Sequence, residues 1–223
     1  MPDSKSFFDA IRSGDLARVQ SLLDADPSLA SAKNESGASA LLLSIYTGRH
    51  DIRKLLLLRG LQMDLAEASA AGELSRVKQL VEIDPAAANS FSADGFPLFA
   101  LACFFGHLDT ARYLAEKGAD IHAAATNGTG YNALTASVAA GHTEIVKYLL
   151  ARGLDPNHRY GPGFTPFLAA AADGHLEIVK LLLAHGADSA AIASDGKSAL
   201  TLATERNHSQ VADFLRSRVA SAS

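Results

Sequence analysis

The chain has 223 residues, of which 48% are hydrophobic and 20% are charged, so it can bury a substantial core and is not an intrinsically disordered protein. Its formal net charge of -4 is spread along the sequence without a basic block, which argues against nucleic acid and against an anionic membrane as partners. The single cysteine, Cys103, excludes an intrachain disulfide, and the first residues lack the pattern of a secretory signal. The longest apolar run, residues 98–105, is too short to cross a bilayer, and we therefore expect a cytoplasmic protein.

Short helices are predicted in pairs along the chain, and each pair turns at a glycine or an asparagine. These anchor residues are, in chain order, Gly14, Gly48, Gly72, Gly106, Gly141, Gly174 and Asn207. A bulky apolar residue stands seven positions before each anchor, namely Phe7, Leu41, Leu65, Phe99, Leu134, Phe167 and Leu200. A leucine stands eight positions after each anchor, namely Leu22, Leu56, Leu80, Leu114, Leu149, Leu182 and Leu215. With a small residue four positions before the anchor, these spacings describe two antiparallel helices joined by a tight turn.

No single pair of this kind can bury its apolar face alone, so the pairs are expected to stack into a solenoid. In chain order, we expect two pairs within residues 6–60 and five more within residues 64–218. All of them should belong to one continuous domain, residues 1–218. The end of the chain, RSRVASAS from residue 216, is small and polar, and we expect residues 219–223 to form a frayed tail.

One interval in this pattern is short. The leucine column steps by 34, 24, 34, 35, 33 and 33 residues, so the connecting hairpin between the second and third pairs is missing, near residues 60–64. The stretch from Asp9 matches the stretch from Glu67 at an offset of 58 residues, which indicates a duplicated unit. Asp64 and Glu67 have the spacing of a capping box, in which each side chain accepts from the other residue's backbone N–H. Three residues between Gly60 and Asp64 are too few for a flexible linker, so we expect direct stacking at this join.

The segment GFTPFLAAAADGHLEIVKLLLAHGAD, residues 163–188, resembles the ankyrin repeat, with Thr165 and Pro166 in its threonine–proline turn. The resemblance covers residues 6–218 and implies an all-α solenoid of about seven stacked helix pairs with short β-hairpin connections. The family's histidine after threonine–proline–leucine is replaced in the complete repeats, by Leu42, Ala100, Thr135, Leu168 and Thr201. The phrase DGFPLFALACFFGHLDTARYLAEKGADIH also resembles ankyrin-repeat proteins that are common in bacteria.

Nothing in the sequence indicates catalysis. His107, His142, His175 and His208 recur just after the anchors, but stacked helices lie about 8–10 Å apart, too far for equivalent histidines to share a zinc ion. We interpret them as turn residues that hydrogen-bond the backbone. Cys103 has no nearby cation or base in sequence, so we interpret it as a buried hydrophobic residue and not as a nucleophile. We therefore predict no catalytic residue, no metal site and no cofactor, and hence no enzyme.

In the ankyrin-repeat family, partners are usually bound on the concave face, by hairpin tips and by the exposed end of each first helix. The residues at such positions that we expect to contact a partner are Tyr46, Phe96, Phe104, Phe105, Tyr131, Tyr160, Phe164, Asp173, Lys197 and Arg206. The resemblance implies a scaffold that binds a protein partner on this face, and the aromatic side chains at these positions are suited to such a contact. We expect the scaffold to be monomeric and non-enzymatic.

Two other functions stay open at this point. An enzyme or a small-ligand binder would have its site in the groove beside the missing hairpin, and a deep pocket with convergent polar groups would favour it over an open aromatic trough. A structural or self-association module is the third possibility. Phe104 and Phe105 are either exposed for a partner or close over the gap together with Tyr46.

Overall fold

The computed structural model describes residues 2–221 and, within them, the side chains of residues 4–218. This part of the chain forms fourteen α-helices and two 3₁₀ helices, with no strand longer than a single bridge. The α-helices are α1 Pro2–Ser13, α2 Leu16–Ala25, α3 Ala40–Tyr46, α4 His50–Leu58, α5 Leu65–Ala71, α6 Leu74–Ile83, α7 Leu98–Phe104, α8 Leu108–Glu116, α9 Ala133–Ala139, α10 Thr143–Leu150, α11 Pro166–Ala172, α12 Leu176–Ala184, α13 Ala199–Glu205 and α14 Ser209–Ser221. The 3₁₀ helices η1 Pro27–Ser31 and η2 Pro85–Asn89 follow α2 and α6. Helix α14 thus continues to Ser221, into the segment expected to fray, and residues 222 and 223 lie outside the described residues.

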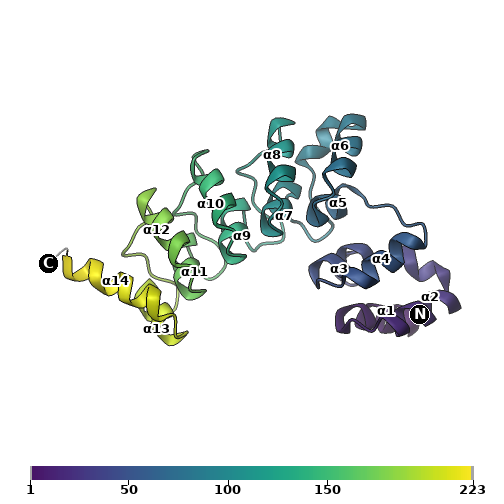
Figure 1. Ribbon diagram of the computed structural model, residues 1–223, viewed down its shortest axis with the longest axis horizontal. Coiled ribbons are helices and arrows are strands. Elements are labelled where there is room, and N and C mark those ends of the chain that lie inside the picture. Colours follow the sequence, from purple (N-terminus) through teal and green to yellow (C-terminus); the bar gives the residue numbers. More distant parts are fainter. Residues whose placement is uncertain (1, 222–223) are drawn as a thin grey trace.

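The helices form seven pairs that stack in one arched row (Figure 1). The odd-numbered helix opens each pair, and these first helices pack against one another in series from α1 to α13. In Figure 1, α5, α7, α9 and α11 lie on the inner side of the arch, and α6, α8, α10 and α12 lie on its outer side. The fold is therefore the predicted all-α solenoid. None of the helices in the described part of the chain is both long and apolar enough to span a membrane.

Tight hairpins connect most of the pairs. Each is marked by one antiparallel bridge, and the bridges are Lys33–Ser39, Phe91–Pro97, Ala124–Asn132, Tyr160–Phe164 and Ile192–Ser198. Residues 59–64, between α4 and α5, form no bridge. The hairpin that the repeat spacing predicts to be missing is therefore absent at this join.

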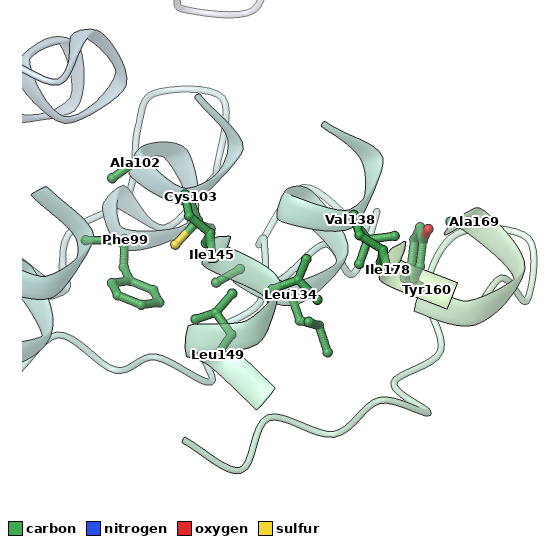
Figure 2. Packing of buried hydrophobic residues seen from close by; sticks show 14 of the residues in the cluster. Phe99, Ala102, Cys103, Leu134, Val138, Ile145, Leu149, Tyr160, Ala169 and Ile178 are labelled. Atoms are coloured by element: carbon green, nitrogen blue, oxygen red, sulfur yellow. The ribbon is translucent and has the colours of Figure 1, made fainter. Parts of the chain in front are cut away.

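Residues of the predicted apolar columns fill the interior between neighbouring pairs (Figure 2). Phe99, Leu134 and Leu149 are almost completely buried, and the small Ala102 lies in the same core. Cys103 is also fully buried there, and burial raises the pKa of its thiol. A thiol that resists ionisation is a poor nucleophile, so its role is packing, as predicted.

At the join, α5 packs directly against α3. The capping box is confirmed, because Asp64 Oδ1 accepts from the Glu67 N–H at 2.8 Å and Glu67 Oε2 accepts from the Asp64 N–H at 2.8 Å. The other oxygen of this buried carboxylate, Oε1, accepts from Ser39 Oγ. Ser39 in turn caps α3, since its Oγ accepts from the Leu42 N–H at 3.0 Å. One carboxylate therefore links the N-termini of α3 and α5. The assignment of residues 1–218 to one continuous domain stays a prediction.

A second kind of contact holds neighbouring pairs together elsewhere in the row. The residue after the anchor glycine reaches back to a carbonyl oxygen of the preceding pair, in the contacts Arg49 Nη2 to Arg12 O at 2.7 Å, His107 Nε2 to Ala70 O at 3.1 Å and His142 Nε2 to Phe104 O at 2.9 Å. At the join this position is Glu73, whose side chain makes no hydrogen bond within the described residues. His107 and His142 thus bond the backbone, as predicted, but they do so across a repeat boundary. The side chains of His175 and His208 form no hydrogen bond within the described residues, so the prediction is wrong for these two.

These contacts make the size of the anchor residue matter. A Cβ added to Gly72 would lie 2.4 Å from His107 Nδ1, whereas one added to Gly48 would meet nothing within 4 Å, and both glycines have positive φ, 72° and 65°. Gly48→Ala should cost about 1–2 kcal/mol for a left-handed alanine. Gly72→Ala must also displace the His107 ring, so it should lower the free energy of unfolding, measured in urea, by at least about 1 kcal/mol more. Equal losses in the two variants would contradict a tight contact between His107 and the anchor.

The buried Glu67 carboxylate predicts a pH dependence of stability. Burial raises the pKa of Glu67 above its ordinary value of 4.5, so the folded state holds this proton more tightly than the unfolded chain does. The contribution of Glu67 to stability is therefore fully present below pH 4.5 and declines as the pH rises through the raised pKa. Glu67→Gln, which can still accept from Asp64 and bond Ser39, should lack this decline, while Glu67→Ala should lose about 1–3 kcal/mol. A constant difference in free energy of unfolding between wild type and Glu67→Gln, from about pH 4 to about pH 8, would contradict the prediction.

Candidate functional site

A cavity of about 350 Å³ lies on the inner side of the row, beside the join. Its lining, which we call the aromatic pocket, consists of Tyr46, Phe96, Ala100, Leu101, Phe104, Phe105, Tyr131, Ala136 and Ala139. These residues come from α3, α7 and α9, from the residue that ends α7, and from the hairpins that precede α7 and α9. The pocket gathers five of the ten residues predicted from sequence to contact a partner, all of them aromatic.

The pocket adjoins a small, separate hydrophobic core that spans the join. Buried side chains from α3, α5, α7 and the first hairpin form this core, and they are Ala38, Leu42, Ile45, Ala70, Leu98 and Leu101. Tyr46, Phe96 and Phe105 pack against it from the pocket side. Helix α5 contributes only alanines and Leu65 to this cluster, so the aromatic rings of α3 and α7 can meet across it.

Tyr46 and Phe105 close part of the gap left by the missing hairpin. Their rings are stacked, with centroids 5.8 Å apart and planes inclined by 19°. Phe104 meets the Phe105 ring edge-on at 5.0 Å, but it is 42% exposed. Of the two phenylalanines, Phe105 therefore fills the gap with Tyr46, whereas Phe104 remains in contact with solvent at the pocket.

The Tyr46 hydroxyl group is fixed by the hairpin before α7. It donates to Asp94 Oδ1 at 3.2 Å, and Ser92 Oγ donates to the same oxygen at 2.5 Å. Burial, and next the negative charge of Asp94, raise the pKa of Tyr46, so its phenol stays protonated and acts as a donor. The pocket wall on the α3 side is thus held both by ring stacking and by a hydrogen bond.

Tyr131, at the other end of the pocket, rests on Tyr160, with ring centroids 4.8 Å apart. The sequence placed Tyr160 on a hairpin tip, but the tip is formed by residues 161–163, and Tyr160 itself is only 8% exposed. It belongs to the same buried cluster as Ala169 and Ile178 (Figure 2). Phe164, its bridge partner, is half-buried against this cluster. Tyr160 and Phe164 therefore support the pocket from behind and do not line it.

The three charged residues predicted for the binding face lie toward the C-terminal end of the row, outside the pocket. Arg206 forms an ion pair with Asp173 at 2.8 Å. Lys197 forms ion pairs with Glu205 at 2.7 Å and with Asp195 at 3.7 Å. All three predicted residues therefore already have an oppositely charged partner within the chain.

Reasoning from the sequence missed several residues that shape the pocket. Ala136 gives it depth because a larger side chain on α9 would fill the space, and Leu101 forms part of its floor. Asp94 was missed as well, although its place just before the tip glycine Gly95 is a usable signal for an exposed polar group. Contacts of this kind join residues far apart in the sequence, and the repeat columns carry no information about them.

The chemistry available in the pocket is that of apolar contact. Among its lining residues only Tyr46 and Tyr131 carry a polar side-chain atom, in each case a phenol oxygen. In the described part of the chain, no group of three or more His, Cys, Asp or Glu residues is placed to hold a metal ion. The arrangement suits the binding of an apolar side chain more than acid–base chemistry.

Comparison with known proteins agrees with this architecture. The family model described as ankyrin repeats in three copies matches residues 65–160 and 155–222, which together make up more than half of the chain. The chain belongs to the ankyrin-repeat family. It is also 36% identical over 92 residues to the ankyrin repeat and SAM domain-containing protein 6 of Mus musculus, and 35% identical over 92 residues to the protein of that name from Rattus norvegicus. Each match covers 41% of this chain but only 10% of the relative, so the chain matches about a tenth of the length of these proteins. The resemblance to bacterial ankyrin-repeat proteins stays a prediction.

The two phenylalanines of the pocket should differ in their effect on stability. Phe105→Ala removes a ring held between Tyr46 and Phe104, so it should lower the free energy of unfolding by about 1–3 kcal/mol, less than the loss for a fully buried phenylalanine. Phe104→Ala should cost under about 1 kcal/mol because much of its ring is already exposed. Urea denaturation of both variants measures the difference, and a larger loss for Phe104→Ala would contradict the assignment of Phe105 as the packing residue.

Proposed function

We propose that this protein is a non-enzymatic protein–protein interaction scaffold that binds a partner on the inner, concave face of its arch. Ankyrin repeats generally mediate protein–protein interactions, and membership of the family supports this class of function. The observation that carries the proposed binding site is the apolar cavity of about 350 Å³ lined by Tyr46, Phe96, Phe104, Phe105 and Tyr131.

The physical properties of the pocket favour a bulky apolar side chain of a partner as its occupant. Burying a side chain of the size of leucine or phenylalanine contributes about 1.5–3 kcal/mol. Phe104 would lose its remaining exposure to water at the same time. Aromatic rings lose few rotamers on binding, and Tyr46 and Phe105 are already fixed by their mutual contact, so the ordering cost of association is small.

The composition of the lining bears on the enzyme and small-ligand alternatives. A site for a polar ligand needs several convergent polar groups, and an acid–base site needs a group that titrates near neutral pH. The pocket offers two phenols, and that of Tyr46 has a raised pKa. An aromatic trough of this kind supports protein binding over either alternative.

A matched pair of substitutions tests the proposed site. Phe104 and Phe91 are both 42% exposed, but only Phe104 lines the pocket. In affinity capture from the cells that make this protein, proteins retained by the wild type and by Phe91→Ala should be lost with Phe104→Ala. Thermal unfolding of all three proteins provides the control for folding.

Two outcomes would count against the proposed function. A set of captured proteins that is unaltered by Phe104→Ala would contradict the pocket as the binding site. We expect a monomer, so sedimentation that shows concentration-dependent association, abolished by Phe104→Ala, would favour a self-association module in its place.

A further inference from the structure

The charges around the aromatic pocket are not evenly distributed. At its α3 end, the Asp94 carboxylate contacts the Tyr46 hydroxyl group, and Asp64 lies near enough to add to the electrostatic effect on Tyr46. Neither carboxylate forms an ion pair within the described residues. Lys33, on the first hairpin, acts electrostatically on Glu67 and likewise forms no ion pair in this part of the chain. The α3 end of the pocket therefore carries carboxylates without a paired cation.

The opposite end of the inner face differs, because its charges are already paired. Asp173 is held by Arg206, and Lys197 is held by Glu205. A cation that approaches the inner face consequently finds at Asp94, beside Tyr46, a carboxylate without an ion pair in the described residues, whereas Asp173 and Asp195, beyond Tyr160, each already contact a basic side chain. The asymmetry gives a bound segment a preferred direction along the groove.

Asp94 has one oxygen that is left for such a cation. Both hydrogen bonds to its carboxylate, from Tyr46 Oη and Ser92 Oγ, end on Oδ1. Oδ2 accepts no hydrogen bond from the described residues. A carboxylate with one oxygen anchored and the other unengaged is suited to a charge-assisted hydrogen bond with an ammonium or guanidinium group.

The position of Asp94 is fixed before any partner binds. Its backbone carbonyl oxygen accepts from Asn127 Nδ2 at 2.9 Å, which ties the hairpin to the next one. The neighbouring Gly95 carbonyl oxygen accepts from the Thr126 N–H at 2.9 Å. A pre-positioned carboxylate loses little conformational freedom on pairing, so more of the electrostatic attraction is retained as binding free energy.

We propose that the partner segment carries a lysine or arginine close to the bulky apolar residue that enters the aromatic pocket, and that this cation pairs with Asp94 Oδ2. The inference rests on the proposed function, because it names the chemistry of the partner of that same pocket. The apolar residue is buried against Phe104 and Phe105, while the cation lies toward α3 beside Tyr46. The partner is thus a basic, amphipathic peptide segment.

Selection from a library of random short peptides displayed on phage tests this chemistry with the full chain as bait. Peptides that bind the wild type but not Phe104→Ala should combine a large apolar residue with a lysine or arginine a few positions away. Selection on Asp94→Asn, whose amide oxygen can still accept from Tyr46 and Ser92, should retain the apolar residue and lose the preference for a cation.

A synthetic peptide from the wild-type selection then gives the quantitative test. Its dissociation constant should rise about tenfold with Asp94→Asn and by less than about twofold with Asp195→Asn. Asp195 is the matched control, since it precedes the tip glycine Gly196 as Asp94 precedes Gly95, but in the last hairpin. Added salt should weaken the wild-type complex more than the Asp94→Asn complex.

The possible failures are distinguishable. Pocket-dependent peptides without a basic residue, or with affinity unchanged by Asp94→Asn, would overturn the paired cation and leave the proposed function in place. A selection in which no peptide depends on Phe104 would overturn the proposed binding site, and the inference with it.

Discussion

The stacking of one helix pair on the next is the contact on which every other feature of this protein depends. A pair alone leaves its apolar columns in water, and only the neighbouring pairs cover them. Phe99 and Leu134, from consecutive pairs, are almost completely buried for this reason. Wherever the chain shortens the connection between two pairs, it must therefore restore that coverage by other contacts. The join between α4 and α5 is such a place, and the aromatic pocket lies beside it.

Two contacts take over at the join. A carboxylate removed from water costs several kcal/mol unless its oxygens are hydrogen-bonded. Glu67 meets this condition by accepting from Asp64 and from Ser39, one partner within its own helix and one in the preceding pair. On the pocket side, Tyr46 and Phe105 stack across the alanines of α5. The first contact aligns the two helices, and the second covers the apolar residues that a hairpin would otherwise shield.

The sequence predicted those features that follow from local spacing. The seven helix pairs and the absent hairpin follow from the spacing of the repeat columns, and the Asp64–Glu67 capping box follows from two residues three positions apart. The hydrogen bonds that cross the join could not be derived from this spacing. Ser39 and Glu67 are 28 residues apart in the sequence, and Tyr46 and Asp94 are 48 apart. Their contacts depend on how two pairs are oriented where the repeat is irregular. The prediction that Tyr160 lies at a hairpin tip was wrong for a related reason. A position in a hairpin does not determine whether the side chain faces the tip or the core.

The open state of the pocket follows from helix geometry. Consecutive residues at the end of a helix point about 100° apart, because a turn takes 3.6 residues. Phe105 faces Tyr46 across α5, so Phe104 cannot pack on the same side and lies instead where α9 presents Ala136 and Ala139. Small residues there leave the cavity that a leucine or phenylalanine on α9 would occupy. One ring of the pair thus stabilises the join, and the other stays exposed because no side chain of the described chain is placed to cover it.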